Sequence, residues 1–141
     1  MKKAGKPFKI IVDTNIWISF LIGKSLKGLQ KYIDSQKVLI ITCTEQIQEL
    51  TEVFQKTKIK KYFTSEQVEE FFELLDESSI YINLKTKTNL CRDLKDNYLL
   101  SLAIDSNADF LITGDNDLLV LKNVEKTRII KFTDFENRIK L

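Results

Sequence analysis

The sequence of 141 residues contains no histidine. This absence excludes Ser-His-Asp and Cys-His catalysis, ribonuclease chemistry based on imidazole acids and bases, and zinc sites that need imidazole ligands. The two cysteines, Cys43 and Cys91, lie far apart and form no CxxC pair, which excludes a thiolate metal site. We expect both thiols to be free, as in a reducing cytoplasmic compartment. Any catalysis must therefore depend on carboxylates, hydroxyls, amines or a bound cofactor.

Several other features are scarce. One proline and four glycines exclude collagen-like and linker-like chains. No apolar run approaches about 18 residues, so we expect no membrane-spanning helix. The first apolar stretch is short and ends at Asp13, which argues against a signal peptide. The net charge of +2 does not by itself imply a nucleic-acid partner, and the length predicts one domain over residues 1–141.

Short apolar runs alternate with helical patterns along the chain. The apolar runs predict strands at residues 10–12, 38–41, 80–82, 110–113 and 128–132. Helical spacing predicts helices at residues 16–22, 25–35, 93–107 and 133–140. Capping-box spacing predicts two more helices, beginning at Thr42 with Glu45 and at Thr64 with Gln67. This alternation predicts an α/β fold, a single-domain α/β/α sandwich with a mainly parallel central sheet.

Acidic residues follow two of the predicted strands. Asp13 follows the first strand, and Asp115 follows the strand that starts near Phe110. Because ligands bind beyond the carboxyl ends of parallel strands, both carboxylates are candidates for a functional site at one sheet edge. A role as helix caps or turn residues is the alternative, since aspartate is common at those positions.

Helical phase directs two further acids toward the core. At about 100° per residue, Asp96 falls within the apolar stripe of its helix and Glu49 falls at the flank of another stripe. A carboxylate on an apolar stripe is costly to bury unless it is paired or bound to a metal. Capping is again the alternative for Asp96, although Asp93 is the better N-cap.

Four carboxylates at one edge would repel one another unless a cation lies among them. No lysine or arginine stands beside Asp13 or Asp115 in the sequence, although Arg92 and Lys95 are close to Asp96. Oxygen ligands without histidine or cysteine suit Mg²⁺ or Mn²⁺, and such ions commonly hold phosphate and activate water. We therefore predict a divalent-cation site formed by Asp13, Glu49, Asp96 and Asp115.

Four segments, taken in order, resemble the motifs of the PIN-domain ribonucleases. They are IVDTN at residues 11–15, QEL at 48–50, DLKDN at 93–97 and TGDNDLL at 113–119. The resemblance is closest to the bacterial and archaeal branch of toxins from toxin–antitoxin pairs. It implies a Mg²⁺- or Mn²⁺-dependent endoribonuclease that cuts single-stranded RNA to 5′-phosphate and 3′-hydroxyl ends, with a small antitoxin protein as partner. Leu94 departs from this branch, which often has proline there.

The resemblance also implies individual roles. The catalytic carboxylates would be Asp13, Glu49, Asp96 and Asp115. Asp117 matches a further acid that joins Asp13, Asp96 and Asp115 at the metal in many members. Asn15 and Thr113 match polar residues that support the first aspartate and the metal site.

Lysines supply candidate contacts for RNA. One cluster contains Lys56, Lys58, Lys60 and Lys61, for which a solvated loop is the alternative. A second set on one helical face contains Lys24, Lys27 and Lys31. The apolar residues Trp17, Phe20 and Leu21 are expected in the core, with a homodimer surface as the alternative.

Two other function classes remain open at this point. A phosphatase or a response-regulator receiver also has an aspartate after the first strand. However, Asn15 stands where the haloacid-dehalogenase pattern needs a second aspartate, and Asn83 and Leu84 stand where a receiver needs its phosphoacceptor. The non-enzyme alternative is a catalytically silent PIN-like scaffold that binds RNA or protein, and the presence of all four acids counts against it.

Overall fold

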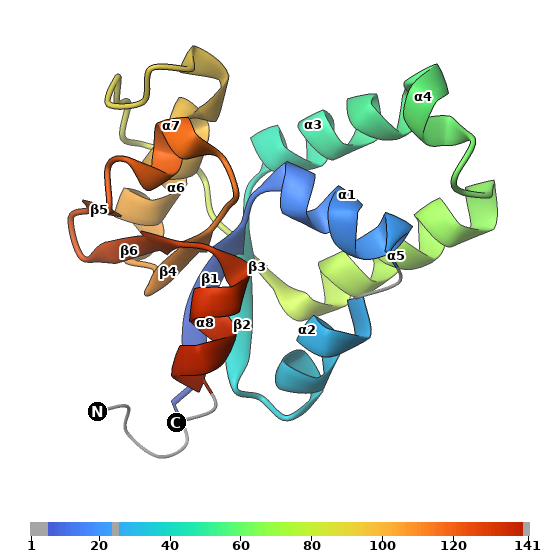
Figure 1. Ribbon diagram of the computed structural model, residues 1–141, viewed down its shortest axis with the longest axis horizontal. Coiled ribbons are helices and arrows are strands. Elements are labelled where there is room, and N and C mark those ends of the chain that lie inside the picture. The colour runs from blue at the N-terminus through green and yellow to red at the C-terminus, as the bar shows by residue number, and fades with distance from the viewer. Residues whose placement is uncertain (1–5, 24–25, 140–141) are drawn as a thin grey trace.

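The structure is a computed structural model that describes residues 6–23 and 26–139. Within these residues, six strands form one sheet in the order β3-β2-β1-β4-β6-β5, in which only the β5–β6 pair is antiparallel (Figure 1). The strands are β1 Phe8–Val12, β2 Val38–Thr42, β3 Ser79–Tyr81, β4 Phe110–Ile112, β5 Asn123–Val124 and β6 Thr127–Ile130. The predicted α/β fold with a mainly parallel sheet is therefore confirmed.

Helices connect the strands. They are α1 Thr14–Ile22, α2 Leu26–Asp34, α3 Thr44–Gln55, α4 Thr57–Lys60, α5 Ser65–Ser78, α6 Asn97–Ser106, α7 Asn116–Leu119 and α8 Phe132–Ile139. A 3₁₀ turn, η1 Leu94–Asp96, precedes α6. Among the helices of the described ranges, none is long and apolar enough to cross a membrane.

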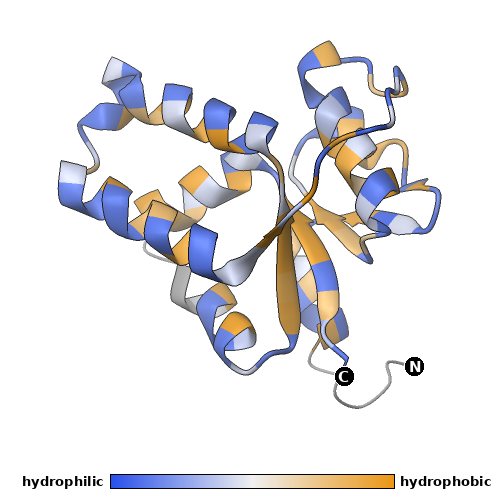
Figure 2. Cartoon of the chain, turned by 180° about the vertical axis from the view of Figure 1, so that it is seen from behind, coloured by the Kyte–Doolittle hydropathy of each residue, from blue (hydrophilic) through white to orange (hydrophobic). Residues whose placement is uncertain are grey.

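The sheet separates two apolar cores, because successive side chains of a strand point to opposite faces. On β1, Ile10 and Val12 pack with residues of α1, α2, α3, α5 and α8, whereas Ile11 packs with residues of α6 and α7. Figure 2 shows the resulting pattern of apolar central strands and helices with polar outer faces. Trp17 and Phe20 are buried in the first core, as expected, so these two side chains offer no homodimer surface.

Some local predictions differ from the structure. The capping box at Thr42 and Glu45 is wrong, because Thr42 is the last residue of β2 and its hydroxyl donates to Gln46 Oε1 at 2.6 Å. Cys43 precedes α3 and makes no side-chain capping bond. The capping box at Thr64 and Gln67 is confirmed by both of its hydrogen bonds. The first turn predicted for the helix over residues 93–107 is the separate turn η1.

Candidate active site

The parallel pairing of β1 with β4 brings two polar side chains together. The register places Val12 opposite Ile112, so the next residues, Asp13 and Thr113, leave the sheet side by side. The Asp13 backbone N–H donates to the Ile112 carbonyl at 2.9 Å. The Thr113 hydroxyl donates to Asp13 Oδ2 at 2.7 Å, and both side chains are buried.

Asp13 is also the N-cap of α1, as the alternative interpretation expected. Its Oδ1 accepts a hydrogen bond from the backbone N–H of Asn15 at 3.2 Å. Burial raises the pKa of the Asp13 carboxyl, and the bonds from Thr113 and Asn15 offset part of that rise. Negative charge on Glu49 and Asp115 raises this pKa further. Capping and proximity to other acids therefore coexist at this residue.

Thr113 links the first aspartate to Asp115. Its hydroxyl oxygen accepts from the backbone N–H of Asp115 at 3.0 Å while its proton goes to Asp13. Asp115 in turn caps the short helix α7, accepting from the backbone N–H of Asp117 at 2.9 Å. A side-chain hydrogen bond with Asp96 and the N–H of Asp117 lower the pKa of Asp115, and the nearby charge of Arg92 lowers it further. Thr113 therefore makes hydrogen bonds to both the Asp13 side chain and the Asp115 backbone.

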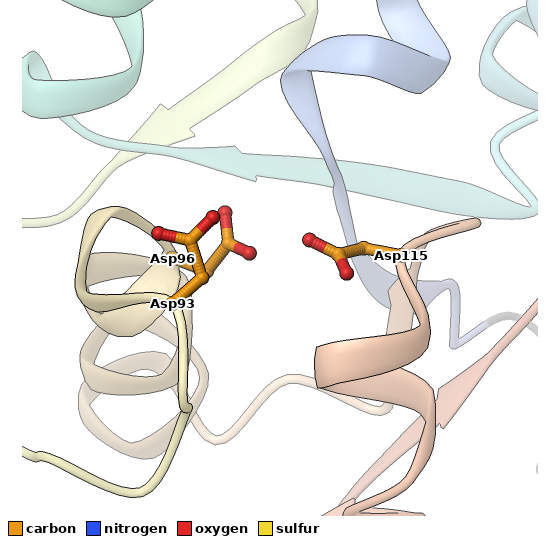
Figure 3. Close-up of side chains that lie close together, drawn as sticks. All are labelled: Asp93, Asp96 and Asp115. Carbon is orange, nitrogen blue, oxygen red and sulfur yellow. The ribbon is translucent and has the colours of Figure 1, made fainter.

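Asp96 completes a compact group of acids together with Asp93. Figure 3 shows these two side chains across the site from Asp115. Asp93 immediately precedes η1, and Asp96 is the last residue of this turn. One carboxylate oxygen of each residue lies within 4.8 Å of the others. Asp93 was expected only as an N-cap; it does accept from the Lys95 backbone N–H at 3.1 Å, and it also belongs to this group.

The environment of Asp96 disfavours its charged form. Burial, a side-chain hydrogen bond with Asp115 and the negative charges of Asp115, Asp13 and Asp93 together raise the pKa of this carboxyl to about 8. Asp96 Oδ2 is buried and has no hydrogen-bond partner among the residues that the structure describes. A cation bound here would stabilise the charged form of Asp96, because this buried oxygen has no hydrogen-bond partner and lies among other negative charges.

Glu49 is held by two hydroxyl groups. The Thr14 hydroxyl donates to Glu49 Oε1 at 2.6 Å, and the Tyr98 hydroxyl donates to the same oxygen. Burial and the negative charge of Glu49 raise the pKa of the Tyr98 hydroxyl, which keeps it protonated as a donor. Sequence reasoning did not find Tyr98. No local sequence signal points to it, because the contact joins α6 to α3.

Asp117 forms an ion pair instead of joining the compact group. Arg92 Nη2 lies 2.8 Å from Asp117 Oδ1. Cys91 fixes the backbone beside Arg92, because its N–H and carbonyl both bond to the Asn97 side chain and its Sγ donates to the Asp117 carbonyl. No lysine or arginine stands beside Asp115 in the sequence, but the fold brings the charge of Arg92 near it.

The remaining predicted residues that the structure describes come from α1, from α2, and from α4 and its flanks. The exposed Asn15 contacts Asp13 through its backbone. Of the first lysine cluster, Lys56 lines a groove beside Glu49, while Lys58 and Lys60 lie on α4, which was expected to be a loop. The Lys61 ammonium lies over the Tyr62 ring at 5.5 Å. In the second set, Lys24 and the Lys27 side chain lie outside the described residues, and Lys31 Nζ lies 5.0 Å from the Tyr32 ring centroid.

Comparison with known proteins identifies the family. The PIN-domain family model matches residues 9–117, a range that contains every acid described above. An uncharacterized protein of Methanocaldococcus jannaschii is 31% identical over 121 residues, covering 84% of this chain and 77% of that protein. The chain therefore belongs to the PIN-domain family, whose members are generally nucleases.

A solved structure shares the fold. It is the crystal structure of VapBC2 from Rickettsia felis, bound to a DNA fragment from the promoter of these proteins. The TM-score is 0.56 at 16% sequence identity, and the match covers 86% of this chain and 97% of that one. The likeness agrees with the PIN-like sheet topology.

Proposed function

We propose that the chain, over residues 1–141, is one metal-dependent nuclease domain that hydrolyses phosphodiester bonds in single-stranded RNA. The observation that carries this proposal is the group formed by Asp93, Asp96 and Asp115, whose carboxylate oxygens lie within 4.8 Å of one another. Thr113 connects this group to Asp13 through two hydrogen bonds. Family membership supports nuclease chemistry and sets aside the phosphatase and receiver alternatives.

The donor set fits a hard divalent cation such as Mg²⁺ or Mn²⁺. All the nearby ligand groups are carboxylates, and Asp96 Oδ2 lacks a hydrogen-bond partner within the described ranges. Asp13, Asp96 and Asp115 would hold the ion, and Asp93 adds a fourth carboxylate. Asp117, expected as a further ligand, would instead act through its ion pair with Arg92.

The chain's own groups then have distinct tasks. When bound, a divalent cation supplies a water of lowered pKa and positive charge that offsets the charge developing on the phosphoryl oxygens. The Thr113 hydroxyl and the Asn15 backbone N–H donate to different oxygens of Asp13 and so fix its orientation. One lone pair on each of these oxygens remains available to bind the ion. Thr14 and Tyr98 hold one oxygen of Glu49, which leaves its second oxygen to accept a proton from the attacking water.

A cleavage assay tests this proposal. Purified protein should cut end-labelled single-stranded RNA in the presence of Mg²⁺ or Mn²⁺ and should stop when EDTA is added. Asp134→Asn, a change at an exposed acid on α8, is the matched control and should cut at the wild-type rate. Absence of cleavage in the metal-loaded, partner-free protein would favour the silent RNA- or protein-binding scaffold.

The hydroxyl contact on Glu49 gives a second expected result. Tyr98→Phe removes one donor but keeps the aromatic ring, so we expect folding to be retained and cleavage to fall by about 10-fold or more, as for other groups that orient a catalytic ligand. Tyr62→Phe, at an exposed tyrosine that follows α4, should cut normally. Equal rates for Tyr98→Phe and wild type would show that Glu49 needs no support from Tyr98.

A small antitoxin protein is the proposed partner. The fold likeness to VapBC2 supports this, as does an apolar pocket of about 400 Å³ between α1, α3 and α5. Leu21, Phe63 and Phe71 line the pocket, and Ile22 beside them is 40% exposed. A small adjacent reading frame with a DNA-binding half would support a toxin–antitoxin pair. The free, buried Cys43 and Cys91 fit a cytoplasmic location, and homodimer formation stays a prediction.

A further inference from the structure

A polar groove of about 390 Å³ opens beside Glu49, and we call it the α3–η1 groove. Its lining residues are Glu45, Gln48, Glu49, Glu52, Val53, Lys56 and Lys95. Five of them come from one face of α3, next to the face that buries Leu50 and Phe54, Lys56 comes from the C-cap of α3, and Lys95 comes from η1. Because Glu49 also belongs to the candidate active site, the groove continues from that site.

Two lysines line this groove from different elements. Lys56 lies at the end of α3, whereas Lys95 lies next to Asp96 in η1. Neither ammonium group forms an ion pair within the described part of the chain, although Glu52 stands one helical turn before Lys56. Two exposed, unpaired ammonium groups beside a phosphodiester-cleaving site are suited to a phosphate group.

The rest of the groove is rich in hydrogen-bond acceptors. Glu45 and Glu52 are exposed on α3, and Val53, the residue after Glu52, offers an apolar contact. With three glutamates against two lysines, the lining does not suit a polyphosphate or a bare run of backbone phosphates. It suits a ligand that carries one phosphate together with N–H donors, and the volume lies within the range of about 300–1,000 Å³ typical of small-molecule sites.

We infer that the α3–η1 groove binds the nucleotide that flanks the scissile phosphate, with the phosphate near Lys56 and Lys95 and the base against α3. This inference rests on the proposed function, because it takes the ligand to be part of the RNA. The groove selects guanine. The Watson–Crick edge of guanine carries two neighbouring N–H donors that match the two oxygens of a carboxylate, whereas uracil offers one donor between two acceptors.

Titration of ¹⁵N-labelled protein with mononucleotides in EDTA tests the groove without metal or cleavage. Guanosine 5′-monophosphate should shift the amide signals of α3 and Lys95, with at least about fivefold higher affinity than uridine 5′-monophosphate. Lys56→Ala and Lys95→Ala should each weaken guanosine monophosphate binding by about three- to tenfold. Glu52→Gln should reduce the preference for guanine, because an amide offers one acceptor oxygen instead of two.

Lys126→Ala is the matched control, since Lys126 is an exposed lysine between β5 and β6 that does not line the groove, and it should bind like wild type. Equal shifts with inorganic phosphate alone, equal affinity for both nucleotides, or shifts confined to other surfaces would overturn the inference. RNA cleavage without nucleotide binding in the groove would also overturn it and leave the proposed nuclease intact. Nucleotide binding by a protein that cuts no RNA with Mg²⁺ would support the groove and contradict the nuclease.

Discussion

Asp96→Asn is expected to abolish RNA cleavage and, in metal-free buffer at pH 8, to raise the melting temperature. Loss of one metal-binding carboxylate should lower the cleavage rate by about 10³-fold or more, because the charge that offsets the transition state is no longer held in place. At the same time the change removes one of several crowded negative charges, so the apo protein should gain about 2–4 °C, equivalent to about 1 kcal/mol.

The sign follows from the pKa of Asp96, which rises from 3.8 to about 8 on folding. Between these two values the folded state binds more protons than the unfolded state, so the free energy of unfolding falls as the pH rises. The destabilisation of the folded state by the charged Asp96 carboxylate is absent below pH 3.8 and complete above about pH 8. The advantage of Asp96→Asn should therefore increase from pH 5 to pH 8.

Thermal melts in EDTA across this pH range measure the effect, with Asp134→Asn as the surface control. A melting temperature for Asp96→Asn that is lower than that of wild type at every pH would contradict the account. It would instead indicate a structural capping role, whose loss usually costs about 1 kcal/mol.

Divalent metal is expected to stabilise the wild-type protein strongly. An ion that binds only the folded state at about 100 times its Kd contributes about 2.7 kcal/mol, which corresponds to roughly 5–10 °C for a chain of this size. The shift should be larger at pH 8 than at pH 6, because the proton on Asp96 must leave before the carboxylate can bind the ion.

Melts with and without Mn²⁺ test this expectation. Asp96→Asn should lose most of the metal-induced shift, while Asp134→Asn should keep all of it. A shift of equal size in the Asp96→Asn protein would place the metal elsewhere on the chain.

The spacing of apolar residues along the chain predicted those features of the fold that depend on neighbouring residues alone. Apolar runs indicated β1, β2 and β4, because strands buried on both faces carry few polar residues. Helical phase indicated that Asp96 faces inward, and the structure places it beside Asp115. One helix start was predicted wrongly: Thr42 has the residue type of a cap but belongs to β2, so its hydroxyl donates to Gln46 instead.

Contacts between distant segments were beyond sequence reasoning. The ion pair of Arg92 with Asp117 and the hydroxyl bond of Tyr98 to Glu49 join residues from different elements, and no local spacing predicts either contact. Asp93 was assigned a capping role, which it has, but a capping carboxylate can also face other acids. Leu94 replaces a common proline without loss of the turn, since its side chain is 75% exposed and makes no core contact.

The most direct test of the central claim is analysis of the RNA ends produced by the wild-type protein with Mn²⁺. If carboxylate-held metal activates water, the products carry 5′-phosphate and 3′-hydroxyl ends, and a single 2′-deoxy substitution at the cleavage site leaves the cut in place. Products with 2′,3′-cyclic phosphate ends, together with loss of cleavage at the 2′-deoxy position, would mean that the ribose hydroxyl attacked. That result would contradict the account.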